Sequence, residues 1–524
     1  MPPSFVACVL AWFSIGCAFL LCRLLLFRSN RILWYFAPWV FFAPLSFFVS
    51  NPLAFFSIAL VFLAVTAVLQ RKNGPAFFAA TFPSVSGGIS WFVPFPGINY
   101  LVLLDFAKLT TATLLGPTLL SPATAGPKTR KTAALDRAIL LFFFLSAILV
   151  FRGLPITSGF RQAFDLFLLI VVPYFSLSRN IGNWRQFQEI LKAFVIIAVI
   201  LCFVEFLSVA RHWSFYQFIP PGLDATPSTL HALIVRYGFM RTSGPINSPL
   251  MGMIFAIALV ALEFGSQTWR ISRVNQRLVQ GILGLGVFLT LSRGAWLGTL
   301  VTFLAYGIIA TGNKRLKIIA WLCSLAGLGY LGLKLATSGN VYGLDPYGTF
   351  QYRVDLFMNS LKAIGLHPFF GSVNFMSDAA MQASRQGQGI IDIVNTYLQI
   401  ALQYGLVTLA IFCTILALVL RRLFKTSRQL KRQSRQDEAN ACNLMIAVIL
   451  GYMAFIATIS QVSLIAQYVY VLVGIGAGVI RLAAAQTRNV RAPQSVKPPN
   501  RRYGAGSTAA NNAFSKRDAA SSHV

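Results

Sequence analysis

The segment Ile391-Asp392-Ile393-Val394-Asn395-Thr396-Tyr397-Leu398-Gln399 marks the place where the longest polar interruption of this sequence, residues 336–395, returns to an apolar run. Apolar runs of roughly 20 residues recur along the chain, and each is long enough to cross a bilayer as a helix. Because lipid cannot satisfy free backbone groups, we expect the spanning elements to be helices. The sequence therefore predicts an all-α polytopic membrane protein with about 12–15 transmembrane helices and one large loop between the late helices.

The amino-acid composition supports this fold class. The 524 residues are 56% hydrophobic and 11% charged, with a mean hydropathy of +0.68, whereas a soluble globular chain carries about 25% charged residues. All seven cysteines lie in apolar segments, and no pair of them has the spacing of metal ligands. The sequence therefore predicts neither a disulfide framework nor a metal site.

The candidate membrane spans can be placed along the chain from the apolar runs. The first, residues 4–27, is too long for the apolar region of a signal peptide and is expected to be a spanning helix. The run 75–93 is rich in proline and glycine, so it is either a span or a re-entrant segment. The full set of runs is 4–27, 32–48, 52–70, 75–93, 98–120, 134–151, 161–177, 187–209, 246–265, 276–292, 294–311, 316–335, 396–420, 441–460 and 462–482.

Positive charge is concentrated in the links on one side of these spans. The chain has 44 Lys and Arg against 14 Asp and Glu, a net charge of +30. Such an excess marks the cytoplasmic loops of membrane proteins, so we assign these links to the cytoplasm and expect no nucleic-acid partner. The basic links are 28–31, 71–72, 128–131, 179–185, 270–277, 314–317 and 421–435.

Two arginines stand on the opposite side, against this rule. Arg293 lies in the tight turn between the runs 276–292 and 294–311, and Arg241 precedes the run 246–265. Guanidinium groups match phosphate oxygens bidentately and stay charged, so this pair could bind a diphosphate. The alternative is that each arginine only reaches lipid headgroups.

The predicted organisation has five parts. The tail is rich in Ala, Ser, Asn and Pro and is basic, so we expect it to be disordered, cytoplasmic and near anionic lipid. The parts are N-terminal transmembrane helices over 1–240, a transmembrane core with the arginine motifs over 241–335, the large outside loop 336–395, C-terminal transmembrane helices over 396–482 and the tail 483–524.

An ordered set of motifs resembles the O-antigen ligase and O-antigen polymerase family of bacterial envelope glycosyltransferases. The resemblance covers residues 241–420, about a third of the chain. Its motifs are Arg241-Thr242-Ser243-Gly244-Pro245, Leu291-Ser292-Arg293-Gly294-Ala295-Trp296, Tyr352-Arg353, Gly365-Leu366-His367-Pro368-Phe369-Phe370-Gly371, Asn395-Thr396-Tyr397-Leu398-Gln399 and Tyr404-Gly405-Leu406.

The resemblance implies a metal-independent glycosyltransferase that needs no cofactor. It acts at the periplasmic face of the bacterial inner membrane, and its donor is an undecaprenyl-diphosphate-linked glycan. Arg241 and Arg293 would hold the diphosphate and stabilise its developing charge. Arg353 either reaches the phosphates or belongs to a solvated helix face. Asn395 and Gln399 are the residues we expect to bind glycan. Other expected partners are membrane lipids, a chain-length regulator and a flippase.

The sequence departs from the family at Val394, where ligases carry a histidine before the Asn of this segment. The loss favours a polymerase of exopolysaccharide or O-antigen repeat units over a ligase that transfers glycan to a lipid A-core acceptor. A flippase or transporter of the same lipid-linked glycan is a further alternative, although such proteins usually show paired halves.

The general base of the reaction is open at this stage. Asp392, Asn395, Gln399 and Gln403 are spaced three, four and four residues apart, which predicts one helical face with Asp392 at its outer end as the base. The alternative is that Asp392 caps the helix. His367 is a second catalytic candidate, and the alternative is that the His-Pro pair at the end of its segment is structural.

Charged residues also occur within or near the apolar runs. Asp105 and Lys108, three residues apart, either serve a function or simply pair with each other.

Overall fold

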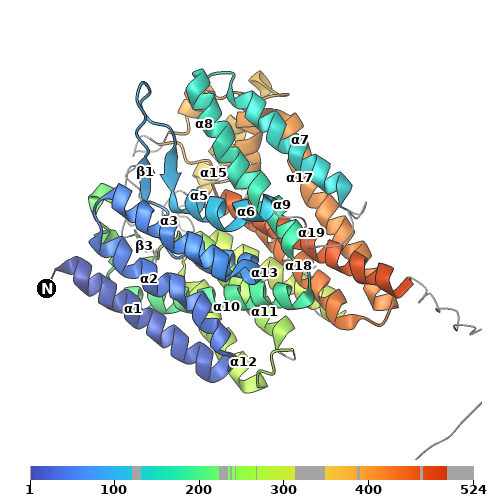
Figure 1. Ribbon diagram of the computed structural model, residues 1–524. Coiled ribbons are helices and arrows are strands. Elements are labelled where there is room, and N and C mark those ends of the chain that lie inside the picture. Colours follow the sequence, from blue (N-terminus) through green and yellow to red (C-terminus); the bar gives the residue numbers. More distant parts are fainter. Residues whose placement is uncertain are drawn as a thin grey trace, which may run out of the picture. The chain divides into compact units, whose positions relative to one another are not determined.

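Long apolar helices make up most of the described chain, which confirms an all-α polytopic membrane protein (Figure 1). The computed structural model describes residues 2–120, 132–223, 234–236, 239–241, 244–266, 268–312, 349–385, 390–460 and 464–491. Within these ranges, eleven helices are long and apolar enough to cross a membrane. The predicted span 316–335 lies outside the described residues.

The elements follow one another in this order. The helices are α1 Pro3–Leu21, α2 Leu33–Phe48, α3 Pro52–Leu69, α4 Gly74–Thr81, α5 Phe106–Thr110, α6 Gly116–Leu120, α7 Ala133–Val150, α8 Ile156–Leu166, α9 Val172–Asn180, α10 Trp184–Arg211, α11 Ser248–Gly265, α12 Arg273–Leu289, α13 Arg293–Thr311, α15 Thr349–Leu366, α16 Ala379–Gln382, α17 Thr396–Arg432, α18 Gln436–Ile456 and α19 Leu464–Arg491. Turns of π-helix at Cys22–Leu26, Thr111–Leu115 and Phe167–Val171 extend α1, join α5 to α6 and join α8 to α9. The strands β1 Ser90–Phe92 and β2 Leu103–Asp105 form one antiparallel hairpin, and β3 Ile234–Arg236 and β4 Phe239–Arg241 form another.

Two of the predicted spans are not continuous helices. The run 75–93 contains only the short α4, a loop and β1, because Pro83 and the pair Gly87-Gly88 interrupt the helix. The run 98–120 begins with β2 and becomes helical only from Phe106 onward, so the prediction of one long helix there is wrong.

The helices differ in how much of their surface faces lipid. α10, α11, α18 and α19 are largely buried among other helices, whereas only 28% of the residues of α3 and 22% of those of α13 are buried. The exposed side chains of α3 include Val61, Val65 and Val68. Apolar exposure of this kind suits contact with lipid, which places α3 at the periphery of the bundle.

α13 packs closely and in an antiparallel direction against α18, and the two helices lie side by side in Figure 1. Gly298 of α13 lies against Phe455 and Gly451, and a Cβ atom on Gly451 would come closer than 3.0 Å to the Thr302 hydroxyl. Small residues let transmembrane helices approach closely. The glycines of α13 therefore position the Arg293 turn against the end of α18.

The helix α17 contains a break at Gly405 that receives the segment 368–372. Gly405 has φ 83° and ψ 173°. The backbone groups around it form hydrogen bonds with the segment 368–372: the Leu406 N–H donates to the Pro368 carbonyl (2.8 Å), and the Ser372 N–H donates to the Leu402 carbonyl (2.9 Å). Gly371, with φ 66°, faces the same break. Two motifs of the sequence analysis are therefore halves of one joint between the loop and α17.

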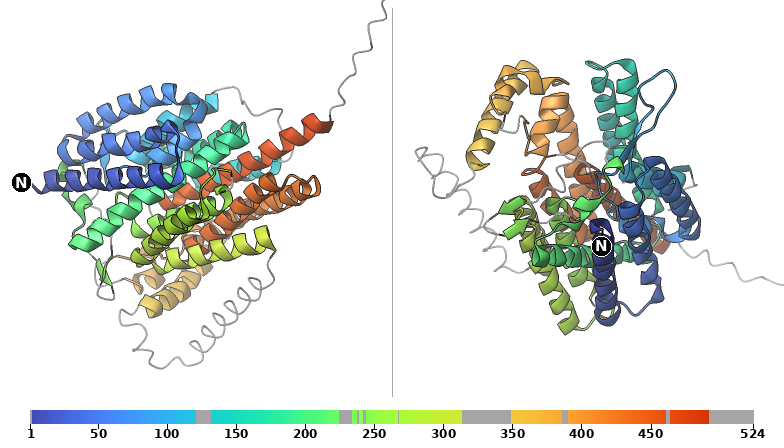
Figure 2. Two further views of the ribbon diagram at one scale, coloured as in Figure 1. Left: turned by 90° about the horizontal axis from the view of Figure 1, so that it is seen from below. Right: turned by 90° about the vertical axis from the view of Figure 1, so that its left-hand side faces the viewer.

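Several connections gather at the end of the bundle that holds this loop. The tip of the β1–β2 hairpin lies beside the start of α8, where the Arg161 guanidinium donates to the carbonyls of Tyr100 and Leu101 (Figure 2). Arg152, after α7, donates to the Phe370 carbonyl (2.5 Å). The described residues up to Ala485 belong to one compact unit.

Candidate functional site

The segment Thr458-Ile459-Ser460, which follows α18, is the meeting point of the predicted site residues. Its position is set by the packing of α13 on α18 and by Thr396, whose hydroxyl donates to the Ile459 carbonyl (3.1 Å). Because α17 begins at Thr396, this hydrogen bond joins the first turn of α17 to the end of α18. Three helices therefore meet at these three residues.

Arg293 and Arg353 both border Thr458. Arg293 is the exposed first residue of α13, after the cap Ser292, and a Cβ atom on the adjacent Gly294 would lie closer than 3.0 Å to the Thr458 hydroxyl. Arg353, in the first turns of α15, donates from Nη2 to the Thr458 carbonyl (3.4 Å). The structure thus brings together two of the three arginines predicted to bind diphosphate.

Asp392 contacts the segment 458–460, and hydrogen bonds hold both its backbone and its side chain. The Ser460 hydroxyl donates to Asp392 Oδ1. The Tyr352 hydroxyl donates to the Asp392 carbonyl (2.9 Å) and accepts from the Asp392 N–H (3.0 Å). Since Tyr352 precedes Arg353, one turn of α15 positions both the predicted base and a predicted phosphate ligand.

The predicted helical face that joined Asp392 to the glutamines is wrong. α17 begins at Thr396, so Asp392 and Asn395 both precede the helix. Asn395 is its cap: Oδ1 accepts from the Tyr397 and Leu398 N–H groups at 2.9 and 3.2 Å. The alternative that Asp392 caps α17 is therefore also wrong, and the capping role commits the Asn395 side-chain oxygen.

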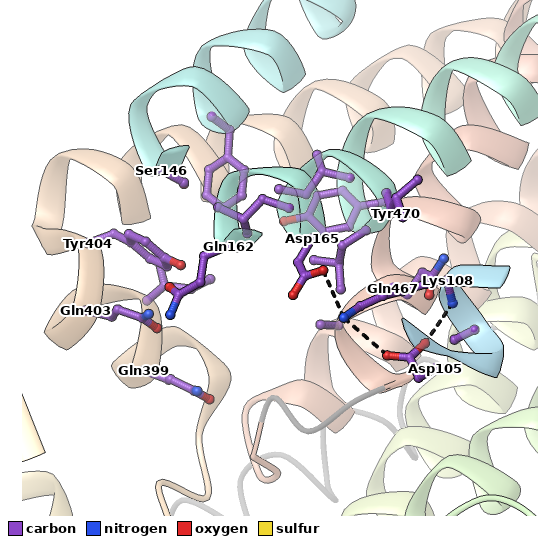
Figure 3. A pocket seen from close by; sticks show the side chains of 18 residues that line it. Asp105, Lys108, Ser146, Gln162, Asp165, Gln399, Gln403, Tyr404, Gln467 and Tyr470 are labelled. Carbon is purple, nitrogen blue, oxygen red and sulfur yellow. Dashed lines mark hydrogen bonds and ion pairs between the residues drawn. The ribbon is translucent and has the colours of Figure 1, made fainter. Parts of the chain in front are cut away.

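Gln399 and Gln403, one turn apart on α17, line a cavity of about 310 Å³. Figure 3 shows both glutamines across this cavity from Lys108, with Gln162 of α8 between them and Asp165. Amide groups offer both donors and acceptors, as sugar hydroxyls require. The predicted glycan ligand Gln399 thus faces a cavity in which a glycan could bind, about one turn from Asn395.

The far wall of this cavity carries a lysine between two carboxylates. Lys108 Nζ lies 2.8 Å from Asp165 Oδ1 and 3.5 Å from Asp105 Oδ2, and it also donates to the Leu103 carbonyl (2.7 Å). Asp105 caps α5 by accepting from the Lys108 N–H (2.7 Å). Desolvation raises the pKa of the Asp105 carboxyl, and the charge of Lys108 opposes that change. The predicted Asp105–Lys108 pair is present, and Asp165 completes it.

Arg241 and His367 belong to two further motifs, whose backbone contacts the structure shows. Arg241 ends β4, three residues before Gly244, and the Pro245 carbonyl accepts from the Gly87 N–H (3.1 Å). His367 is exposed directly after α15, where its carbonyl accepts from the Gly371 N–H (3.0 Å). The backbone of His367 thus closes the turn that enters the break in α17, a structural role for this motif.

A comparison with known protein families identifies the central part of the chain. Residues 278–413 match the model of the family described as O-antigen ligase. This part of the chain is an O-antigen ligase domain. It holds Arg293, Arg353 and Asp392, whereas Arg241 precedes it. No curated protein matches the chain.

Members of this family transfer glycosyl groups, so the protein is a multi-pass membrane enzyme of O-antigen or polysaccharide assembly. The O-antigen ligase domain ends before Thr458 and Ser460, which the sequence analysis also missed. The polar residues Thr458, Ser460 and Gln461, between two apolar runs, were the available signal, but nothing in their spacing points to Arg353 or Asp392.

Proposed function

We propose that this protein polymerises undecaprenyl-diphosphate-linked repeat units of an exopolysaccharide or O-antigen at the periplasmic face of the inner membrane. The observation that carries the proposal is the convergence of Arg293, Arg353 and Asp392 on one short segment within and beside the O-antigen ligase domain. Arg353 and Asp392 reach this segment with their side chains and Arg293 adjoins it through Gly294, which supports a site with cations and a carboxylate for transfer from a diphosphate.

In the proposed reaction, a sugar hydroxyl of the acceptor attacks the anomeric carbon of the donor glycan. A new C–O bond forms as the bond from that carbon to the diphosphate breaks, and the lipid diphosphate leaves with the electron pair. Arg293 and Arg353 stabilise the charge that develops on the diphosphate. Asp392, held by Ser460 and Tyr352, takes the proton of the attacking hydroxyl.

The cavity beside Gln399 and Gln403 is the proposed binding place for the acceptor glycan. It lies within one or two turns of Asn395 along α17, so a glycan held there could present a hydroxyl toward Asp392. Transfer needs the two substrates held in a near-attack geometry, which fixed binding groups supply.

The second candidate is a ligase that transfers the assembled glycan to a lipid A-core acceptor. The description of the matched family as O-antigen ligase favours it. Val394, at the position of the ligase-type histidine, favours the polymerase. Incubating the purified protein with lipid-linked repeat units alone distinguishes them, because only a polymerase lengthens the glycan without a separate lipid A-core acceptor.

Replacing Asp392 with Asn should reduce the rate of transfer about 100-fold, because the amide cannot accept the proton of the attacking hydroxyl. The rate is measured with purified protein and lipid-diphosphate-linked repeat units. Asp355→Asn is the matched control: it removes an exposed carboxylate from the same loop, and its rate should equal that of the wild type. A wild-type rate for Asp392→Asn would exclude this residue as the base.

The side of the membrane is tested separately from the chemistry. A cysteine introduced at exposed Gln382, in the loop that precedes α17, should react with a membrane-impermeant thiol reagent added to intact spheroplasts. Labelling only after the membrane is broken would place this loop in the cytoplasm and would contradict the periplasmic active face.

A further inference from the structure

A cationic cavity lies at the end of the bundle opposite the candidate site. α11 starts where Gly252 packs against Ala295 beside the Arg293 turn, and it ends at Gly265, just before the residues that line this cavity. The cavity has a volume of about 600 Å³. We call it the cationic pocket, and its charged residues are Arg23, Arg28, Arg31, Glu189, Lys192 and Arg270.

The single carboxylate of the pocket is already neutralised. Glu189 Oε1 lies 2.8 Å from Lys192 Nζ, and Glu189 Oε2 accepts from the Tyr35 hydroxyl (2.8 Å). None of the four arginines forms an ion pair with a carboxylate of the described residues. The pocket therefore carries an uncompensated charge of four guanidinium groups, which favours an anion with phosphate-like oxygens.

Trp269 gives an independent indication of an oxygen-rich ligand. It lines the pocket, and its indole N–H is buried without an acceptor among the residues that the structure describes. A buried donor without an acceptor is costly. The neighbouring Arg270 also holds a strained backbone, with φ 55° at a non-glycine residue. Because this N–H is buried, a ligand oxygen would reach it only after the indole turned toward the pocket.

A separate apolar groove lies between α1 and α2, and its lining residues are neighbours in sequence of those that line the pocket. It has a volume of about 910 Å³ and is lined only by apolar residues, including Trp12, Gly16 and Phe19 of α1. Phe19 lies one helical turn before Arg23, and Leu33, in the groove, directly follows Ile32, in the pocket. Cations thus lie near one end of an apolar groove, and this arrangement suits an amphiphilic ligand.

We propose that the pocket and groove together bind an anionic glycerophospholipid, with its phosphate among the arginines and one hydrocarbon chain between α1 and α2. The bilayer supplies such lipids at high local concentration, and clustered arginines attract their headgroups. The lipid-linked donor fits less well, because its diphosphate is proposed to bind at the other end of the bundle. A bound phospholipid would fasten α1 and α2 to the link between α11 and α12.

The test uses the full-length protein, freed of lipid in detergent, with phosphatidylglycerol as the probe. Binding is counted by native mass spectrometry, and the change in Tm is recorded, because a ligand that binds only the folded state raises Tm. We expect one retained phosphatidylglycerol and a higher Tm, with at least a tenfold weaker effect of phosphatidylcholine. Inorganic phosphate, which lacks the hydrocarbon chain, should bind far more weakly.

Two variants separate the pocket from the groove. Arg23→Ala with Arg31→Ala should reduce phosphatidylglycerol affinity at least tenfold. Gly16→Leu should do the same without touching a charge, since a Cβ atom on Gly16 meets nothing within 4 Å and the added side chain fills the groove. The control pair Arg421→Ala with Arg422→Ala, in the basic part of α17, should leave binding unchanged.

Three results would overturn the proposal. An equal loss in the Arg421–Arg422 control would mean general attraction to a basic surface. Full retention of phosphatidylglycerol by Gly16→Leu would exclude the groove. Displacement of phosphatidylglycerol by equimolar undecaprenyl phosphate would assign the site to a polyprenyl lipid. If the double arginine variant fails to fold, which its Tm without lipid reveals, Gly16→Leu alone decides.

Discussion

Replacing Arg293 with alanine should reduce glycan transfer by about 100-fold or more. Arg293 is exposed at the start of α13, so its guanidinium adds to the positive end of the helix dipole. In Arg293→Ala, the lipid diphosphate would lose the guanidinium that stabilises the negative charge it gains as it leaves. The measurement is the initial rate of polymer formation by purified protein from lipid-diphosphate-linked repeat units.

A lysine at this position tests whether the geometry of the arginine matters beyond its charge. Arg293→Lys keeps the cation but loses the planar fork that matches two phosphate oxygens, so its rate should fall between those of the wild type and Arg293→Ala. Arg385→Ala, which removes an exposed arginine from the outer loop, is the matched control and should act like the wild type. Equal rates for Arg293→Ala and Arg385→Ala would refute the role of Arg293 in binding diphosphate.

The sequence predicted the fold class because the signal for a spanning helix is long and simple. A run of about 20 apolar residues has only one stable conformation in lipid, so α1, α7, α10 and α11 follow from composition alone. The prediction failed at 98–120, where the run contains Asp105, Lys108 and Pro117 and is divided between a strand and a broken helix. Burial against other helices permits such irregular backbone, and burial is not visible in a single sequence.

The candidate site shows a sharper limit. Arg293 of α13 was identified from the charge pattern and Arg353 of α15 from its motif, but the nearby Thr458 was not identified, because its position depends on how α13 and α18 pack. Asp392 was assigned to a helix by a spacing that suits one, yet Asn395 starts the helix after it. Residue spacing predicts which side chains share a helical face only when the first residue of the helix is known. Here the cap Asn395 sets that first residue at Thr396.

The structure also gives the glycines of two motifs a different role from the one that the sequence suggested. Gly294 in the Ser-Arg-Gly turn and Gly405 in Tyr-Gly-Leu resemble functional motifs, but each lies where another part of the chain approaches too closely for a side chain. They position the site without contacting a substrate. Such a role predicts loss of stability on substitution as well as loss of activity, and Gly405 gives the clearest case.

Gly405→Ala should destabilise the joint between α17 and the outer loop by about 3 kcal/mol or more, and activity should fall with it. The backbone of Gly405, with φ 83° and ψ 173°, lies in a region that is essentially restricted to glycine. A Cβ atom there would also come closer than 3.0 Å to the Phe369 carbonyl. The alanine must therefore push the segment 368–372 out of the break or force α17 to reorganise.

The expected change is local at first, so its measurement should be local too. Limited proteolysis should cut Gly405→Ala near exposed Phe369 and Phe370 well before the wild type, and Tm should fall. Gly365→Ala is the matched control: Gly365 is helical within α15, its Cβ atom would meet nothing within 4 Å, and alanine suits a helix better. If Gly405→Ala resists protease as well as Gly365→Ala does, the break in α17 does not depend on glycine. If it is cut early, the first turns of α17, which hold Asn395 and Gln399 in place, owe their position to a residue that contacts no substrate.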